Sequence, residues 1–335
     1  MLYRQIYQLI FDFLDLIDKL TYRQVSKEFK NFHITDLMSF KNYNYLLLLN
    51  ETILKQHLHT KKLLAPHNTN ITQLNFLVHL QELYLSGSDR SSNCSINELT
   101  NLRKLTLSNF PSITDLNTLT KLEVLKIYGS NAIDNQSIKE LNLSEFACSS
   151  YLHVTSFTHM TNLKRLSIQG SDCSVKNDDI RGLDLTYLDI SFNTSITDLS
   201  FLAKSLKQLI APDTLINDHT IDCLDLTHLD ISGARNVRSI DHMTNLVSLK
   251  INNESQISDK SIKKLLNLVE LQTRDNKNIT DVNHLTKLKI LHACRSGITD
   301  SGIDKLDLDT LYTCDNKNIT KRIPGTQPFH DCDLD

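Results

Sequence analysis

The sequence predicts an α/β solenoid, in which short parallel strands stack into a sheet on the concave face and short helices or turns follow the convex face. Three observations lead to this prediction. A pattern of the form L-x-x-L-x-L/I recurs at intervals of 20 to 22 residues from Leu80 to Leu308. The segments that return from one copy to the next alternate between two forms. A residue type that favours the start of a helix has a fixed place in each form.

Each copy of the pattern has the residue spacing of a short strand with one buried side. Apolar residues alternate with variable ones, so the apolar side chains point to one side of the strand. One such strand cannot bury its own apolar side, whereas a stack of strands shares a continuous core. Each buried Leu or Ile then contributes about 1.5–3 kcal/mol. The first leucines of the pattern are Leu80, Leu102, Leu122, Leu143, Leu163, Leu185, Leu206, Leu226, Leu246, Leu268, Leu288 and Leu308, and a degenerate copy precedes them at residues 60–66.

The return segments predict a short helix or helical turn after each strand, on the convex side. The first form reads SITDLNTLTKL at residues 112–122, and the second reads ISDKSIKKLLNL at residues 257–268. Asn, Asp and Ser are the residues that cap the start of a helix, and we expect them to do so here. In the second form these residues are Asn135, Asn177, Asp218, Asp259 and Asp300, and in the first form they are Asp115, Ser156, Asp198, Ser239 and Asp281.

The period and the motif resemble those of the leucine-rich-repeat family, and the resemblance covers about three quarters of the chain. The first form is similar to the short bacterial and cytosolic leucine-rich repeats. The second is similar to the repeats of F-box/leucine-rich-repeat proteins. The resemblance implies a leucine-rich-repeat solenoid of about 12–13 repeats.

Polar residues just after the strands are expected to stack from one repeat to the next. Asn193, Asn276 and Asn316 share one place, where a leucine-rich repeat often stacks asparagines to satisfy the backbone of the turn. Cys294 and Cys314 also occupy equivalent places in successive repeats. We interpret these two cysteines as small stacked side chains rather than as nucleophiles.

The variable positions of the strands predict a partner-binding face. Solenoids use their concave sheets for binding, and the side chains on this sheet are polar, charged and aromatic without a single sign. That mixture favours a protein partner over a nucleic acid or a small acidic molecule. For any one position, the alternative is an ordinary solvated strand residue. The predicted partner-binding residues are Tyr84, Arg103, Lys126, Tyr128, Asp189, Asp230, Lys250, Gln272, Arg274, His292 and Tyr312.

The first residues follow a different pattern from the repeats. Apolar residues between Leu2 and Phe32 have helical spacing, which predicts three short amphipathic helices. So small a unit buries little surface alone, and such a unit is often completed by a partner. The alternative is a helical cap that seals the open N-terminal end of the solenoid.

The order of these residues resembles the F-box, which reads L-P-x-x-I, I-F-x-x-L, L-x-L-x-D-L and V-S/C-K-x-W/F in turn. Tyr3 stands in place of the usual proline, and Phe29 in place of the common tryptophan. The matching residues are Leu2 and Ile6, then Ile10, Phe11 and Leu14, then Asp15, Leu16, Asp18 and Leu20, then Val25, Ser26, Lys27 and Phe29. The resemblance implies docking to the Skp-type adaptor subunit of an SCF ubiquitin ligase. The residues it implies for this contact are Leu2, Ile6, Ile10, Leu14, Leu16, Leu20 and Val25.

These patterns divide the chain into four parts. Residues 1–36 form the F-box-like helical unit, and residues 37–58 are a helical linker or the N-terminal cap of the solenoid. Residues 59–320 form the solenoid. Residues 321–335 are a C-terminal tail, in which Pro324, Gly325 and Pro328 predict a loop or frayed end.

Composition and charge limit the partners and the compartment. The net charge of −3 and the scattered Lys and Arg residues predict no general affinity for nucleic acid or membrane. No secretory signal is visible, and the seven cysteines form no CxxC pair, which suits reduced thiols in a cytoplasmic or nuclear protein. Frequent Asn, Ile, Lys and Asp hint at a protist or a large DNA virus, and a viral protein would act in the host cytoplasm. We expect a monomer outside its complex.

The sequence contains no catalytic constellation. No Gly-rich phosphate loop is present, and no His or Cys cluster has the spacing of a zinc finger, so we predict neither a metal nor a cofactor. The sequence therefore predicts a non-enzymatic adaptor that presents a target protein to an SCF-type ubiquitin ligase. The alternative is an interaction scaffold without a ubiquitin role.

Overall fold

The computed structural model describes residues 36–37, 49–66, 71, 73–87, 96–129, 131–149, 153–253 and 255–320. The chain forms two compact units, Met1–Asn162 and Leu163–Asp335. The predicted F-box-like unit, except for Asp36, and the predicted C-terminal tail lie outside the described residues. Within the described part, no helix is both long enough and apolar enough to cross a membrane.

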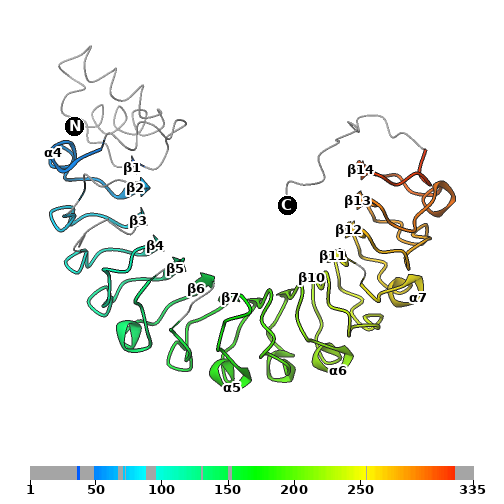
Figure 1. Ribbon diagram of the computed structural model, residues 1–335, viewed down its shortest axis with the longest axis horizontal. Coiled ribbons are helices and arrows are strands. Elements are labelled where there is room, and N and C mark those ends of the chain that lie inside the picture. The colour runs from blue at the N-terminus through cyan, green and yellow to red at the C-terminus, as the bar shows by residue number, and fades with distance from the viewer. Residues whose placement is uncertain are drawn as a thin grey trace, which may run out of the picture. The chain divides into compact units, whose positions relative to one another are not determined.

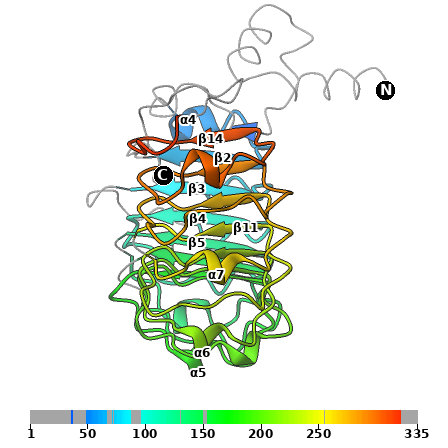
Figure 2. The ribbon, with the colours of Figure 1, turned by 90° about the vertical axis from the view of Figure 1, so that its right-hand side faces the viewer.

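Unit 1 contains a parallel sheet in which each strand pairs with the next one along the chain. The strands β2 to β5 are stacked one above another in Figure 2. A short helix α4 (Glu51–Leu54) lies before β2, and a 3₁₀ turn η2 (Gln136–Ile138) follows β5. The strands are β1 (Asp36–Leu37), β2 (Lys62–Pro66), β3 (Glu82–Ser86), β4 (Lys104–Ser108), β5 (Val124–Tyr128) and β6 (Glu145–Ser149).

The strand β1 was not predicted. Asp36 pairs with Lys62 and Leu37 with Leu63, so β1 extends the repeat sheet by one parallel strand. Leu37 is buried there. Leu37 is therefore not part of a helical linker, whereas its place at the first sheet edge agrees with the alternative of an N-terminal cap. The strand was not apparent from the sequence, because two residues that complete a sheet edge carry no periodicity of their own. The helix α4 does lie inside the predicted linker.

Unit 2 repeats the same parallel arrangement with shorter strands. Its strands lie on the concave side, and α5, α6 and α7 lie on the convex side (Figure 1). The strands are β7 (Arg165–Gln169), β8 (Tyr187–Asp189), β9 (Gln208–Ile210), β10 (His228–Asp230), β11 (Ser248–Lys250), β12 (Glu270–Gln272), β13 (Ile290–His292) and β14 (Thr310–Tyr312). The helices and 3₁₀ turns are α5 (Asn177–Ile180), η3 (Ser200–Leu202), α6 (Asp218–Ile221), α7 (Asp259–Ile262) and η4 (Asp300–Gly302).

The predicted leucine pattern forms the core of both units. All twelve first leucines of the pattern are at most 5% exposed. The strand leucines follow the same rule, since Leu83, Leu105 and Leu125 are buried and paired in register. In unit 1 the rings of Phe146 and Phe157 lie 5.1 Å apart and fill the core between two turns. The solenoid prediction is therefore confirmed.

The two forms of return segment differ in structure as well as in sequence. The second form gives the short helices α5, α6 and α7 and the turns η2 and η4, whereas the first form gives a 3₁₀ turn only at η3 among the described residues. In the first form Asp115, Asp198 and Asp281 act as predicted at the start of the turn. Each accepts a hydrogen bond from the backbone N–H two residues later, at 2.9 Å.

In the second form Asn135 is the N-cap residue of η2 as predicted, although its side chain makes no cap bond. The other four predicted caps, Asn177, Asp218, Asp259 and Asp300, lie one residue after the true N-cap. The helix α6 is capped by Asn217, whose side chain accepts a bond from Thr220 N at 3.1 Å, and Ser258 has this place before α7. Asp218 and Asp259 instead reach the next turn of the solenoid. Asp218 Oδ1 accepts bonds from Arg238 N at 2.7 Å and from the following N–H at 2.9 Å. Only stacking of the turns creates this contact, so residue order within one repeat could not reveal it.

From β4 onward, a residue with positive φ follows each strand whose turn lies entirely within the described residues. It lies three residues after the central strand residue, and Asn, Asp or Gly occupies most copies because these residues adopt positive φ at low cost. The residues are Asn109, Gly129, Gly170, Phe192, Asp213, Gly233, Asn253, Asp275, Arg295 and Asp315.

The predicted asparagine stacking is confirmed. Asn193, Asn276 and Asn316 are buried and bond to the backbone of their own turn and of the preceding one. In contrast, Cys314 is disulfide-bonded, which contradicts the prediction of reduced thiols at this residue. Sequence spacing misses such a bond, because folding can bring together cysteines that lie far apart in the chain.

Candidate partner-binding face

The register of both sheets places the variable strand residues in columns. In unit 1, Tyr84 pairs with Thr106, and Thr106 with Lys126. In unit 2, Asp230 pairs with Lys250, and His292 with Tyr312. The predicted central column is thus reproduced within each unit. Its members are Tyr84, Thr106, Lys126 and Ala147 in unit 1, and Ser167, Asp189, Ile210, Asp230, Lys250, Gln272, His292 and Tyr312 in unit 2.

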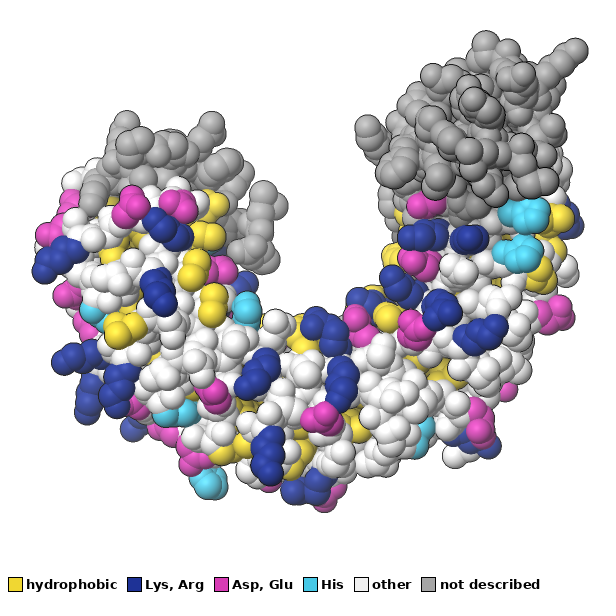
Figure 3. All heavy atoms as spheres, turned by 180° about the vertical axis from the view of Figure 1, so that it is seen from behind, with side chains coloured by type: hydrophobic (Ala, Val, Ile, Leu, Met, Phe, Trp, Pro, Cys, Tyr) yellow, Lys and Arg dark blue, Asp and Glu magenta, His cyan; other side chains and the backbone are white. Residues whose placement is uncertain are grey.

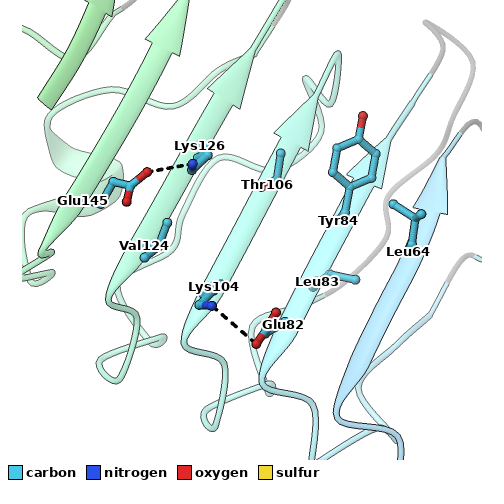
Figure 4. A pocket seen from close by; sticks show the side chains of 9 residues that line it. All are labelled: Leu64, Glu82, Leu83, Tyr84, Lys104, Thr106, Val124, Lys126 and Glu145. Atoms are coloured by element: carbon cyan, nitrogen blue, oxygen red, sulfur yellow. Dashed lines mark ion pairs between the residues drawn. The ribbon is translucent and has the colours of Figure 1, made fainter. Parts of the chain in front are cut away.

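A depression of about 350 Å³ lies on the strand face of unit 1. Figure 4 shows the Tyr84 ring standing beside Leu64, with the Glu82 and Lys104 pair nearby and the Lys126 and Glu145 pair beyond Thr106. Its lining residues are Leu64, Glu82, Leu83, Tyr84, Lys104, Thr106, Val124, Lys126 and Glu145. The depression therefore offers an apolar and aromatic patch within a charged rim.

Ion pairs between neighbouring strands hold the charged rim in place. Glu82 lies 3.2 Å from Lys62 and 3.5 Å from Lys104, and Lys126 lies 2.7 Å from Glu145. These side chains are partly exposed, so each pair adds about 0–1 kcal/mol to stability. Their larger effect is to fix charges of both signs in known places on the face. Sequence reasoning missed Glu82, Lys104 and Glu145, although all three stand two residues before the central column.

Two further predicted residues of unit 1 lie next to this depression. Arg103 forms an ion pair with Glu123 on the adjacent strand end, and both side chains are exposed. Tyr128 is 37% exposed, and partial burial raises the pKa of its phenol. Its hydroxyl therefore stays protonated at neutral pH and can both donate and accept a hydrogen bond.

The predicted contact residue Asp189 of unit 2 is not available to a partner. It is 5% exposed, and its carboxylate accepts bonds from Ser191 Oγ at 2.6 Å and from Gln169 Nε2 at 2.6 Å. Ser191 N adds a third bond at 3.0 Å. These neighbours fold over the carboxylate from the turn and from the adjacent strand. Asp189 is therefore a structural residue, and the expectation that it faces solvent is wrong.

Other residues of the central column differ in how accessible they are. Gln272 is 7% exposed and donates a bond to Glu270 Oε1 at 2.8 Å, so it too is largely covered. Asp230 and Lys250 are half-buried. Asp230 Oδ1 accepts a bond from Ser232 N at 3.0 Å.

Aromatic and guanidinium groups occupy both ends of the unit 2 sheet. The rings of His292 and Tyr312 stack with centroids 4.2 Å apart. At the other end, the Arg165 guanidinium lies 4.0 Å from the centre of the Tyr187 ring. Such planar groups are enriched where proteins bind one another.

The predicted residue Arg274 belongs to a charged cluster beside the His292 and Tyr312 rings. It lies 3.9 Å from Asp275, which also forms a two-bond pair with Arg295 at 2.7 and 2.8 Å. The Arg295 guanidinium lowers the pKa of the Asp275 carboxyl. The cluster is internally neutralised in part, so it presents both signs of charge.

Catalytic chemistry finds little support in the described residues. Burial raises the pKa of the Cys173 and Cys294 thiols, and it also raises that of Cys223. A protonated thiol is a poor nucleophile. Among the residues that the structure describes, no group of three or more His, Cys, Asp or Glu side chains could hold a metal. On the face that Figure 3 shows, basic and acidic side chains of the described residues both occur.

The residues predicted to bind a Skp-type adaptor all precede Asp36, so they lie outside the described residues. Their role stays a prediction. The partner-binding role of the strand face also stays a prediction.

Solved structures of similar fold include repeat proteins from bacteria. A leucine-rich-repeat protein of Leptospira interrogans is 17% identical, with 85% of each chain covered and a TM-score of 0.50. An internalin of Listeria monocytogenes is 21% identical over 77% of this chain and 76% of its own, with a TM-score of 0.48. The functional domain of a second Listeria internalin is also 21% identical, over 78% of this chain and 64% of its own, with a TM-score of 0.46.

No family model matches the sequence, and no curated protein matches it significantly. The fold therefore rests on the strand register and buried leucine pattern of the two units, together with the Leptospira structure. It is the leucine-rich-repeat solenoid.

Proposed function

We propose that this chain is a non-enzymatic adaptor that binds a target protein on its concave face and docks to an SCF-type ubiquitin ligase through residues 1–36. The target-binding part is carried by one observation. The strand face of each unit presents aromatic groups and charges of both signs, held in place by neighbouring strands. Ordered polar groups around aromatic anchors suit a complementary protein surface, because little further ordering is needed on binding.

The ligase link is supported by the F-box-like order of residues between Leu2 and Phe29, immediately before the repeats. In this proposal the helical unit contacts a Skp-type adaptor subunit, and the repeats hold the target near the ligase. In this proposal, other subunits of the ligase perform the covalent chemistry, and this chain contributes binding alone.

A scaffold without a ubiquitin role is the second candidate. The strand β1 favours it, because Asp36 and Leu37 extend the repeat sheet at its first edge. Covering an open sheet edge is the task of a solenoid cap. In that case residues 1–36 protect the core and bind no ligase subunit.

Co-purification with a Skp-type adaptor separates the two candidates. We would compare the full chain with a truncation that lacks residues 1–35, which leaves β1 intact, and with the double variant Leu14→Asp and Leu20→Asp. Adaptor capture by the full chain alone supports the ligase link. The matched control is Glu82→Lys on the strand face, which should keep full adaptor capture.

The outcome that contradicts the ligase link is equally clear. If the folded full chain captures no adaptor, while the truncation lowers its melting temperature, then residues 1–35 act as a cap. Target binding is tested separately, since it depends on the strand face and not on the ligase.

A further inference from the structure

Phe192 breaks the residue rule of the left-handed turn position. Eight of the ten copies of this position hold Asn, Asp or Gly, and the exceptions are Phe192, at φ 62°, and Arg295, at φ 49°. A bulky side chain with positive φ is a strained choice. Arg295 has a local explanation, because its guanidinium forms the two-bond pair with Asp275 on the preceding turn.

No such explanation exists for Phe192 within the described chain. Its side chain is 51% exposed, and no aromatic or cation–π contact involves its ring among the described residues. The residue therefore combines a strained backbone position with a large exposed apolar surface. Strain that the fold does not need is a marker of function.

Phe192 is one of four apolar residues that two adjacent turns of unit 2 present at or near their surface. Its N–H donates to Pro212 O at 3.0 Å, which places the two turns side by side. Pro212 follows the central residue Ile210, and Leu215, which is 53% exposed, lies further along the same turn. We call these four residues, Ile210, Pro212, Phe192 and Leu215, the Phe192 strip. The strip runs from the concave face to the edge where the strands end.

Carboxylates border the Phe192 strip, and Lys250 lies beyond Asp230 in the strand register. Asp230 is next to Ile210 in the strand register, and Asp213 takes the left-handed position one turn after Phe192. Asp172 is exposed on the preceding turn. Among the described residues, no ion pair joins these three carboxylates to a Lys or Arg side chain. In the next turn, Arg235 occupies the position equivalent to that of Leu215, so the Phe192 strip ends there.

The side chain of Asp213 also has a defined place. A Cβ added to Gly233 would lie 2.1 Å from Asp213 Oδ1, so the carboxylate rests against the bare backbone of the next turn. Glycine at this position leaves room for the carboxylate at the edge of the strip. An apolar surface bordered by unpaired negative charge is complementary to an apolar side chain with positive neighbours.

We propose that the Phe192 strip binds an extended segment of the target protein, in which an apolar anchor residue is flanked by Lys or Arg. This inference rests on the proposed target-binding function and is independent of the ligase link. The anchor contacts Phe192 and Leu215, and the flanking cations lie near Asp172, Asp213 and Asp230. At a protein interface, apolar residues at the centre supply most of the affinity, and charges at the rim supply specificity.

Synthetic peptides test the proposal with the full chain. We would measure fluorescence anisotropy with short labelled peptides in matched sets: an apolar anchor flanked by Lys and Arg, the same anchor flanked by Asp and Glu, and the basic residues without an anchor. The first set should bind about tenfold or more tightly than either other set, which corresponds to about 1.4 kcal/mol.

Two variants, Phe192→Asn and Asp213→Asn, and one control test whether the peptides bind at the Phe192 strip. Phe192→Asn keeps a residue suited to positive φ, so its melting temperature should be equal to or above that of the parent chain, while peptide affinity falls about tenfold or more. Leu266→Asn is the matched control, because Leu266 is also 53% exposed but lies away from the strip. It should leave peptide affinity unchanged. Asp213→Asn should weaken binding of the basic peptides and reduce its salt dependence.

Three results would overturn the proposal. The basic peptides fail to bind the folded chain, or they bind Phe192→Asn as well as the parent, or Leu266→Asn weakens them equally. The second result would leave target binding elsewhere on the face intact, so it separates failure of the strip from failure of the proposed function. A lower melting temperature for Phe192→Asn would contradict the inferred strain.

Discussion

Replacing Asn276 with alanine would measure how much a stacked turn asparagine stabilises the solenoid. Asn276 is fully buried, and its Nδ2 donates to Ile257 O at 3.1 Å, with a weaker bond to Ile251 O at 3.4 Å. Its Oδ1 accepts from Asn278 N at 2.8 Å. Alanine would leave one N–H and one well-bonded carbonyl without partners. The carbonyl belongs to the buried Ile257, and a buried group without a partner costs about 1–3 kcal/mol, whereas the N–H belongs to the exposed Asn278 and can bond to water. We therefore expect a loss of about 1–3 kcal/mol.

The backbone itself should tolerate this substitution. Ala234 occupies the equivalent place after β10, and its N–H makes the same turn bond, to Ile231 O at 3.1 Å. The loss in Asn276→Ala is therefore expected to come from missing hydrogen bonds rather than from a different turn. Asn245→Ala is a suitable control, because Asn245 bonds to Asp225 on the exposed surface and should change stability by less than about 0.5 kcal/mol.

Urea unfolding combined with amide hydrogen exchange would test the prediction. Repeat arrays do not always unfold in one step, so exchange is needed to assign the loss to a region. Protection should fall at Asn278 and in the turns on either side of Asn276, while amides in unit 1 provide an internal reference. A change below about 0.5 kcal/mol, with unchanged protection, would refute the account of the turn, since a buried carbonyl without a partner must cost more than that.

Three further predictions concern charged residues of unit 2. Asp189→Lys should lower the melting temperature strongly, because it places an unpaired charge in a buried site lined with hydrogen-bond donors. Asp230→Lys should fold normally, because Asp230 is half-buried. If both variants changed the melting temperature equally, the difference in burial between the two residues would be contradicted. Asp259→Ala should cost about 0.5–2 kcal/mol, measured by urea unfolding, because it removes bonds to the next turn, and an unchanged midpoint would argue against those bonds. Arg295 lowers the pKa of the Asp275 carboxyl, so its folded-state pKa lies below the unfolded value of about 3.9. The stability that the ionised Asp275 contributes is therefore present at neutral pH and is lost as the pH falls through the folded-state pKa. The melting temperatures of the parent and Asp275→Asn should therefore differ at pH 7 and converge as the pH falls through the folded-state pKa of Asp275.

The sequence was sufficient to predict the strand register, and the reason is physical. A strand with period-two alternation has only one register that buries its leucines, so the spacing of Leu83, Leu105 and Leu125 determines which residues face outward. The central column followed directly. The turn asparagines were predictable for the same reason, since Asn193 and Asn276 recur at a fixed distance after their strands.

Contacts between turns were less accessible from the sequence. Asp218 looks like a helix cap in its own repeat, but its carboxylate satisfies the backbone of the following turn, twenty residues later. Asp189 looks like a surface residue by its place in the strand, but Gln169 and Ser191 enclose it. Neither outcome depends on residue order within one repeat. Both depend on which side chains the stacking brings within reach.

The regularity of the solenoid also makes its exceptions informative. Ten left-handed turns share one backbone geometry, so each provides a reference for the others, and a residue that departs from the common choice requires a local cause. For Arg295 that cause is its pair with Asp275. For Phe192 the neighbouring turns supply strain and exposure but no compensating contact. Solenoid turns interact mainly with their neighbours, and among the described residues no ring-stacking or cation–π contact compensates for Phe192. In our proposal a target segment supplies that contact, and this is why Phe192 is a better guide to binding than the many charged residues whose strand neighbours already pair with them.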